Sequence, residues 1–207
     1  MAAIKLKGDT SGEITIQAPA VAGTTTLNIP AVSGNILTDG QALPAIDGSA
    51  LTGITTGKVL QVLQAHKTDA FSTASSSFTD ITGLSVSITP SSTSSKILII
   101  WKCVVAGNVS NHADLRLMRN ATAIDVGGAA GNRTPTTAGH YSASNFMMTA
   151  SGVYLDSPSS TSSTTYKLQL RTNTGNAIVR INSNYDYNDA STTPVTASSI
   201  TVMEIAG

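Results

Sequence analysis

The sequence predicts an all-β protein whose main body is a β-sandwich or jelly roll. Helical periodicity is nearly absent, whereas apolar and polar residues alternate with a period of two in many runs after residue 58. These runs are short, and stretches rich in Gly, Pro, Ser, Thr and Asn separate them. About eight to ten short strands at such spacing are typical of antiparallel sandwiches.

Residues 1–57 differ from the rest because they carry a repeat. The phrases PAVAG, PAVSG and PAIDG begin at Pro19, Pro30 and Pro44, and a short strand-like run, TIQA or TLNI, precedes the first two. Proline cannot donate to a strand ladder, so each strand ends there, and glycine permits the chain to reverse. Strands this short cannot enclose a core, so they must stack on a partner.

We therefore expect residues 1–57 to form an anchor or docking segment, with a flexible linker as the alternative interpretation. The apolar and proline positions of the repeat are the candidate docking residues. They are Ile14, Ile16, Pro19, Leu27, Ile29, Pro30 and Pro44.

Residues 58–207 are predicted to form the head domain. KVLQVLQA (58–65) favours a strand over a helical turn, because it is rich in β-branched residues and follows Gly57. LSVSI (84–88) and YKLQLR (166–171) each place three apolar residues on one face, and SITVMEI (199–205) places Ile200 and Val202 opposite Met203 and Ile205. KILIIWKCVV (96–105) is apolar on both faces, which predicts a central strand covered on both sides.

The composition excludes several classes of function. Charged residues make up 12% of the chain and the net charge is zero, whereas soluble domains carry about twice that share of charge. Lys and Arg form no run, which argues against nucleic-acid binding. No stretch is long and apolar enough for a membrane span or a signal peptide, so we expect no membrane insertion, assembly in the cytoplasm and release by lysis.

We expect no enzymatic activity, no metal and no cofactor. Cys103 is the only cysteine and lies in an apolar strand pattern, so it is expected to be buried and inert. His66, His112 and His140 show no metal-ligand spacing. The aspartates are scattered near turns with no linking motif, and no nucleophile elbow, P-loop or dinucleotide fingerprint occurs. The scattered aspartates are Asp80, Asp114, Asp125 and Asp156.

The stretch NYDYND is the candidate recognition loop, because Tyr and Asn give adaptable contacts at low entropic cost. A solvated turn is the plainer interpretation, and no calcium-loop spacing is present. If the chain enters and leaves the jelly roll at one end, the loop 182–196 lies at the opposite end. The same count places 156–163 at that distal end and 173–176 at the entry end. The candidate residues are Asn184, Tyr185, Asp186, Tyr187, Asn188 and Asp189.

The segment Gly8–Gly40 resembles the N-terminal signature of tailed-phage virion proteins, chiefly tail-fibre-type proteins of marine and cyanobacterial phages. That signature reads G-x-x-S-G-x-I-T-I/L-x-A-P, then A-G-x-x-T-L-x-I/L-P and a final G-x-L-L-T. The matching residues are Ser11, Gly12, Ile14, Ile16, Ala18, Pro19, Ala22, Gly23, Thr26, Leu27, Pro30, Gly34, Leu37 and Thr38. The phrase AIDGSALTGI (45–54) is also common in such chains.

The head resembles jelly-roll domains of the tumour necrosis factor and complement globular-head type. The matching phrases are FTDITGLSVSITPSSTSSKILI (78–99), TTYKLQLRT (164–172) and SSITVMEI (198–205). This resemblance implies a homotrimer whose last strand lies near the threefold axis. The residues it places in that trimer and core strand are Ile200, Val202, Met203 and Ile205.

Together the two resemblances imply a structural phage virion protein: a short, trimeric, tail-fibre-type protein held by its N-terminus, with a distal head for host attachment. A capsid decoration or vertex protein of the same architecture, which stabilises the shell, is the alternative. A free, lectin-like binding module is the third interpretation. The implied partners are further copies of the chain, other virion proteins and a host-cell surface glycan or protein, and the implied location is the virion.

Overall fold

The computed structural model describes residues 3–7, 13–17, 59–107, 111–142, 146–175 and 177–207. The chain divides into two units, Met1–Thr52 and Gly53–Gly207. In the first unit, strands β1 (Ala3–Lys7) and β2 (Glu13–Gln17) pair antiparallel. Of the candidate docking residues, Ile14 and Ile16 lie in β2, opposite Leu6 and Ile4. The remaining five, Pro19, Leu27, Ile29, Pro30 and Pro44, lie outside the described residues.

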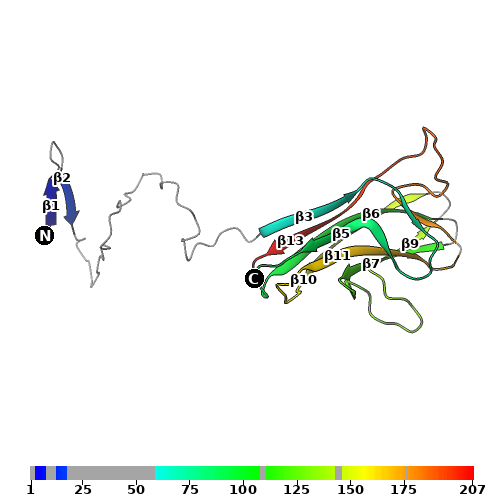
Figure 1. Cartoon of the computed structure of the whole chain (residues 1–207), viewed down its shortest axis with the longest axis horizontal. Helices are drawn as coiled ribbons and strands as arrows, with labels where there is room; N and C mark the ends of the chain where they lie inside the picture. The colour runs from blue at the N-terminus through cyan, green and yellow to red at the C-terminus, as the bar shows by residue number, and fades with distance from the viewer. Residues whose placement is uncertain (1–2, 8–12, 18–58, 108–110, 143–145, 176) are drawn as a thin grey trace. The chain divides into compact units, whose positions relative to one another are not determined.

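The second unit consists of eight longer strands and three short ones, with no helix among its described residues (Figure 1). The eight are β3 (Val59–Lys67), β5 (Thr79–Ile88), β6 (Lys96–Gly107), β7 (Asn111–Arg119), β9 (Ala138–Ser142), β10 (Met147–Asp156), β11 (Thr164–Thr172) and β13 (Ser198–Ile205). The three short ones are β4 (Phe71–Thr73), β8 (Thr122–Ile124) and β12 (Val179–Ile181).

The longer strands form two antiparallel sheets with jelly-roll connectivity. The first sheet, here the β13 sheet, has the order β3-β13-β6-β10, and β4 and β12 extend it. The second, the β11 sheet, has the order β5-β11-β7-β9, and β8 pairs with β7. When the eight longer strands are numbered one to eight in chain order, the β13 sheet has the spatial order 1-8-3-6. The β11 sheet then has the order 2-7-4-5. This is the double Greek key of a jelly roll, and it confirms the predicted all-β sandwich.

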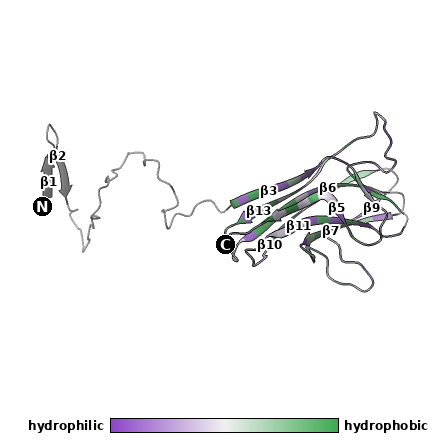
Figure 2. Ribbon diagram, viewed as in Figure 1, coloured by the Kyte–Doolittle hydropathy of each residue, from purple (hydrophilic) through white to green (hydrophobic). Residues whose placement is uncertain are grey.

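The core lies between the sheets and follows from the alternation in sequence. Every second residue of β11 and β13 is buried, as is every second residue of β5 from Leu84 onward. Hydrophobic and hydrophilic residues correspondingly alternate along the strands of the head (Figure 2). Such inward residues interdigitate across the roughly 10 Å between packed sheets. The shared faces predicted for LSVSI and YKLQLR are confirmed and turn inward, and on β13 the inward pair is Ile200 and Val202; all of these apolar residues are at most 7% exposed. They are Leu84, Val86, Ile88, Tyr166, Leu168, Leu170, Ile200 and Val202.

Strand β6 is central in its sheet, as predicted, because it pairs with both β13 and β10. It is not covered on both sides along its whole length. Val104 and Ala106 are buried on the outer face, but Ile100 is 39% exposed there. Cys103 is fully buried on the inner face. Only the last third of β6 therefore has the two-sided burial that its apolar sequence predicts.

Both ends of the head's described chain lie at the same end of the sandwich. β13 pairs antiparallel with β3, and Ile205 lies opposite Val59 (Figure 1). We call this the base end and the opposite end the tip end. As expected, residues 182–196 lie toward the tip end, because Ser198 lies opposite Lys67.

The expected positions of the two neighbouring loops are wrong. Residues 156–163 lie at the base, since Asp156 pairs with Ile97, and residues 173–175, the described part of the other loop, lie at the tip. The reason is that β12 is not a separate full-length strand. β12 and β13 both run antiparallel to β6, one after the other, so they form a single strand path that residues 183–197 interrupt.

Two buried acids hold the base together. Glu204, fully buried, accepts hydrogen bonds from the Ser91 amide and hydroxyl, from Ser95 Oγ and from Gln61 Nε2. Asp156 accepts hydrogen bonds from Tyr166 and Arg119. Glu204 thereby fixes the loop between β5 and β6 against the last strand.

Candidate functional site

The candidate recognition residues belong to a loop that is closed at its root. We call residues 183–197 the tip loop. Asn182 and Ser198 flank it, and the Ser198 hydroxyl donates to Asn182 Oδ1 at 2.6 Å. Asn182 Nδ2 donates to the carbonyl oxygens of Lys67 and Asp69, and Ser198 Oγ accepts from the Val104 amide. A surface loop whose ends meet in this way is an Ω-type loop.

Asn182 is suited to this position by its backbone as well as by its side chain. Its φ is 62°, in the left-handed region that Asn tolerates better than most residues. It is fully buried, and its amide group forms three hydrogen bonds. The root of the tip loop is therefore part of the sandwich core.

Beyond its root the tip loop is exposed and is organised by its own polar groups. Asn184 Oδ1 accepts from the Tyr187 amide at 3.0 Å, and Asn188 Oδ1 accepts from Thr193 Oγ1 at 2.8 Å. Both amide oxygens are thus used within the loop, so they are not arranged as calcium ligands. No group of three or more His, Cys, Asp or Glu residues suited to a metal occurs within the described ranges.

Tyr187 is the most prominent aromatic residue of this loop. Its side chain is 61% exposed, and its φ of 48° is unusual for an aromatic residue. Arg180, on β12, stacks its guanidinium 5.0 Å from the ring centroid and donates from Nε to the Tyr185 carbonyl. The guanidinium thus lies over one face of the ring, and the ring also lines a pocket within the tip loop.

A pocket of about 270 Å³ lies within the tip loop. Both arms of the loop line it: Asn184, Tyr187 and Asp189 from the first, Pro194 and Val195 from the second. A wider depression of about 510 Å³ adjoins it and is also lined by Phe146, before β10. Val195 is 79% exposed and Phe146 is 67% exposed.

The six sequence-predicted residues, 184–189, all lie in the tip loop. The structure places further residues beside them that the sequence did not single out. The alternation signal could not identify Arg180, Val195 or Phe146, because the fold alone brings Arg180 and Val195 to Tyr187 and Phe146 to Asn184 and Asn188. A partial signal exists in STTPV, since Pro194 follows a run of turn-forming residues.

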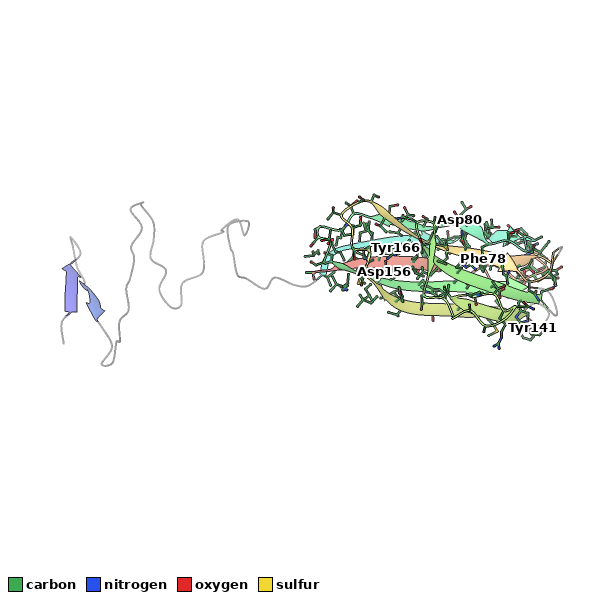
Figure 3. The ribbon with its side chains drawn as sticks, turned by 90° about the horizontal axis from the view of Figure 1, so that it is seen from below. Phe78, Asp80, Tyr141, Asp156 and Tyr166 are labelled. Atoms are coloured by element: carbon green, nitrogen blue, oxygen red, sulfur yellow. The ribbon has the colours of Figure 1, made fainter. Side chains whose placement is uncertain are left out.

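Three of the four aspartates singled out in the sequence, Asp80, Asp114 and Asp156, lie elsewhere and are paired. Burial raises the pKa of the fourth, Asp125. On the outer face of the β11 sheet, Lys167 binds Asp80 at 2.6 Å and Arg171 binds Asp114 at 2.7 Å. Phe78 stacks against Arg116 on the same face, with the guanidinium 3.7 Å from the ring centroid. In Figure 3, Phe78 and Asp80 lie farther from the base end than Asp156 and Tyr166.

Two of the histidines become neighbours, which their sequence separation does not predict. In the β7–β9 pair, His112 lies opposite Tyr141, with ring centroids 4.9 Å apart, and His140 lies opposite Ala113. Burial and the nearby His112 lower the pKa of His140. His66 is exposed on β3, in the other sheet.

Cys103 is chemically quiet in its buried position. Burial raises the pKa of its thiol to about 12, and a hydrogen bond with Ser198 offsets only part of this effect. The reactive form of cysteine is the thiolate, so this residue is a packing element. None of the described segments forms a helix that could cross a bilayer.

Comparisons with known proteins give little further information. No protein-family model matches the sequence, and no curated protein matches it. Among solved structures, the chain is similar to one in the structure of infectious bursal disease virus Gx strain, with 16% identity and a TM-score of 0.32. That match covers 79% of this chain and 47% of the viral chain, so this chain spans about half the length of its structural neighbour.

Proposed function

We propose that this chain is a structural phage virion protein, a short tail-fibre-type homotrimer held by its N-terminal segment and carrying a distal head for host attachment. The observation that carries the proposal is the polarity of the head. The N-terminal segment joins the sandwich at its base, where Val59 begins β3, and the exposed tip loop lies toward the other end. A protein fixed at the base presents Tyr187 outward.

The two outer faces of the sandwich differ in a way that supports self-association. On the β11 sheet the outer face carries ion pairs. On the β13 sheet the outer face carries an apolar band that crosses β3, β13, β6 and β10 and is flanked by exposed Lys96 and Lys102 of β6, and the exposed apolar residues of this band range from 39% to 65% accessible. They are Val62, Ile100, Val153 and Leu155, with half-buried Leu98 and Met203 between them. Contiguous apolar patches of this kind are uncommon on monomers.

Further copies of the chain are the occupant that we propose for this apolar face. A rotation axis brings the same strand of each copy together, so charges on that strand would repel one another. The outward residues of β13 are Ser199, Thr201, Met203 and Ile205, which carry no charge. Its one charged residue, Glu204, points inward and is fully hydrogen-bonded.

Host attachment through the tip loop is tested by excising that loop. Residues 184–195 are replaced by two glycines, which the Thr196 amide and Asn182 carbonyl, 3.3 Å apart, allow as a tight turn. Particles with this change should assemble with a normal content of the protein but fail to adsorb to cells. The control replaces residues 128–134, in the loop after β8, by two glycines. Normal adsorption of the tip-loop variant would refute the attachment role.

Capsid decoration remains the second candidate, because the same apolar face and N-terminal segment would serve a shell protein equally well. In that case the excision would leave adsorption unchanged, and removal of residues 1–57 would lower the temperature at which the capsid releases its genome. The combination of these two results identifies the decoration role.

A further inference from the structure

We propose that the pocket of the tip loop binds an uncharged pyranose sugar through the exposed ring of Tyr187. This inference names the ligand class of the attachment site and rests on the proposed function only for its biological meaning. It is argued from the shape, the charges and the polar groups of the pocket.

The shape suits one sugar ring. At about 270 Å³ the pocket lies just below the usual range for small-molecule sites, so it fits a single ring better than an extended ligand. The adjoining depression of about 510 Å³ is open and offers room for the next unit of a chain.

An apolar platform and a rim of polar groups occur together. Tyr187 and Val195 approach the pocket from the two arms of the loop and are 61% and 79% exposed. A pyranose has an apolar face of C–H groups, which packs on an aromatic ring, and hydroxyls at its edge. Asn188 and Asp189 supply an amide donor and carboxylate acceptors at the rim, the pair of functions that adjacent hydroxyls require.

The platform is held in place before any ligand arrives. The cation–π contact from Arg180 holds the ring from behind, and Asn184 holds the backbone of Tyr187. A fixed aromatic side chain loses little entropy on binding. The positive φ of Tyr187 is a strained conformation of the kind that concentrates at binding sites.

The charges select against acidic sugars. Among the residues that line the pocket and the adjoining depression, the charged ones are Asp189 and Asp186. Arg180 stacks on Tyr187 and bonds to the Tyr185 carbonyl, so its charge is directed to the loop itself. A carboxylate or phosphate on a ligand in the pocket would meet the negative charge of Asp189, whereas a neutral ring would not be repelled.

The test is binding of sugars to the full 207-residue chain, measured by saturation-transfer NMR and calorimetry. The probes are the methyl glycosides of glucose, galactose, mannose and N-acetylglucosamine, with glucuronic and N-acetylneuraminic acids as acidic sugars. At least one neutral glycoside should bind, with an affinity that changes less than about twofold between low and high salt. The acidic sugars should not bind, and a calcium chelator should have no effect.

Variants locate the binding. Tyr187→Asn removes the ring at a backbone position that Asn tolerates, and it should weaken binding by about tenfold or more. Tyr187→Phe should bind within a few-fold of the parent, and Val195→Ser should weaken binding. The matched control is Tyr141→Asn, which removes a tyrosine that is 57% exposed and does not line the pocket (Figure 3). Unchanged binding by Tyr187→Asn, preference for an acidic sugar, loss of binding with chelator or no binding across the panel would each overturn the proposal.

The failure of this inference is distinguishable from that of the attachment role. If the protein binds a neutral sugar but particles with Tyr187→Asn adsorb normally, the sugar site stands and attachment through it falls. If no sugar binds but those particles fail to adsorb, the loop contacts another class of host molecule.

Discussion

The side chains of Asn182 and Ser198 meet at 2.6 Å across the root of the tip loop, although fifteen residues separate them in the chain. This hydrogen bond closes an excursion that interrupts the last strand path of the sandwich. The buried end of the loop thus belongs to the core, while its exposed end is free to carry recognition residues. Stability and binding are therefore expected to respond to different mutations.

Replacing Asn182 by Ala should destabilise the head by about 3 kcal/mol. The change removes the acceptor of the Ser198 hydroxyl and the donor to the carbonyls of Lys67 and Asp69, and it puts Ala at a positive φ. Urea denaturation of the full chain measures the loss. Asn120→Ala is the matched control, since Asn120 also has a positive φ, 52°, but is exposed, and it should cost about 1 kcal/mol. Equal losses for the two variants would contradict a special role for the root.

Gly152→Ala should destabilise the sandwich, because a Cβ at Gly152 would lie 2.7–2.8 Å from the indole of Trp101. Forcing this contact costs about 1–3 kcal/mol in a packed core. Trp101 is the only tryptophan, so its fluorescence reports the displacement directly. Gly128→Ala is the control, since nothing lies within 4 Å of its Cβ. An unshifted emission spectrum together with unchanged stability in Gly152→Ala would contradict this prediction.

Glu204 should contribute to stability above about pH 4.5 and lose that contribution as the pH falls toward 2. Burial by itself raises the pKa of Glu204, but hydrogen bonds from Ser91, Gln61 and Ser95 outweigh it and hold the pKa at about 2. The unfolded chain, with a normal pKa near 4.5, therefore binds the proton first, and acid favours unfolding. Between pH 5 and 2.5 the melting temperature of Glu204→Gln should fall less than that of the parent. Parallel curves would show that Glu204 titrates normally.

Cys103 should react with a thiol reagent only after the head unfolds. The residue is fully buried and its thiol pKa is raised to about 12 by burial, so the thiolate is scarce at neutral pH. Labelling of the full chain with a disulfide reagent should be negligible in buffer and complete in denaturant. Ala113→Cys, a second buried position, should behave alike, whereas Ser85→Cys on an exposed face should react at once. Rapid labelling of Cys103 in native buffer would indicate that the sandwich opens locally at β6.

Met203→Glu should dissociate the oligomer that we propose. Met203 lies on the outer face of β13, and three copies of a new carboxylate near one axis would repel one another. Native mass spectrometry should change from the mass of three chains to that of one 21.1 kDa chain. Ser85→Glu, on the outer face of the β11 sheet opposite Lys167, should leave the trimer intact. A parent protein that is already monomeric would refute the trimer.

Much of the fold was predictable because alternation is a local property. Alternate residues face inward as their spacing requires, and Cys103 is buried as its neighbours indicate. The inward residues are Leu84, Val86 and Ile88 in β5 and Tyr166, Leu168 and Leu170 in β11. The orientation of two connections was not predictable. The sequence of β12 looks like a strand, but nothing local indicates that β12 and β13 share one path beside β6. If β12 is counted as a full-length strand, each connection before it is assigned to the wrong end of the sandwich.

The candidate site was predictable only in part. The two tyrosines in NYDYND are visible as a local excess of aromatic residues, and both lie in the tip loop. Their supports are not local: Arg180 precedes the loop, Val195 returns from its far arm and Asn182 is bonded to residues near the end of β3. Hydrogen bonds between segments distant in sequence decide which loop residues are displayed, and a single sequence does not reveal them.

A cryo-electron microscopy reconstruction of the intact particle tests the central claim most directly. The account predicts the sandwich as a trimer, with the base end, Val59 and Ile205, toward the particle and the tip loop pointing outward at the host-facing side of the tail. A head with the tip loop buried against the particle, or particles without this protein, would contradict it.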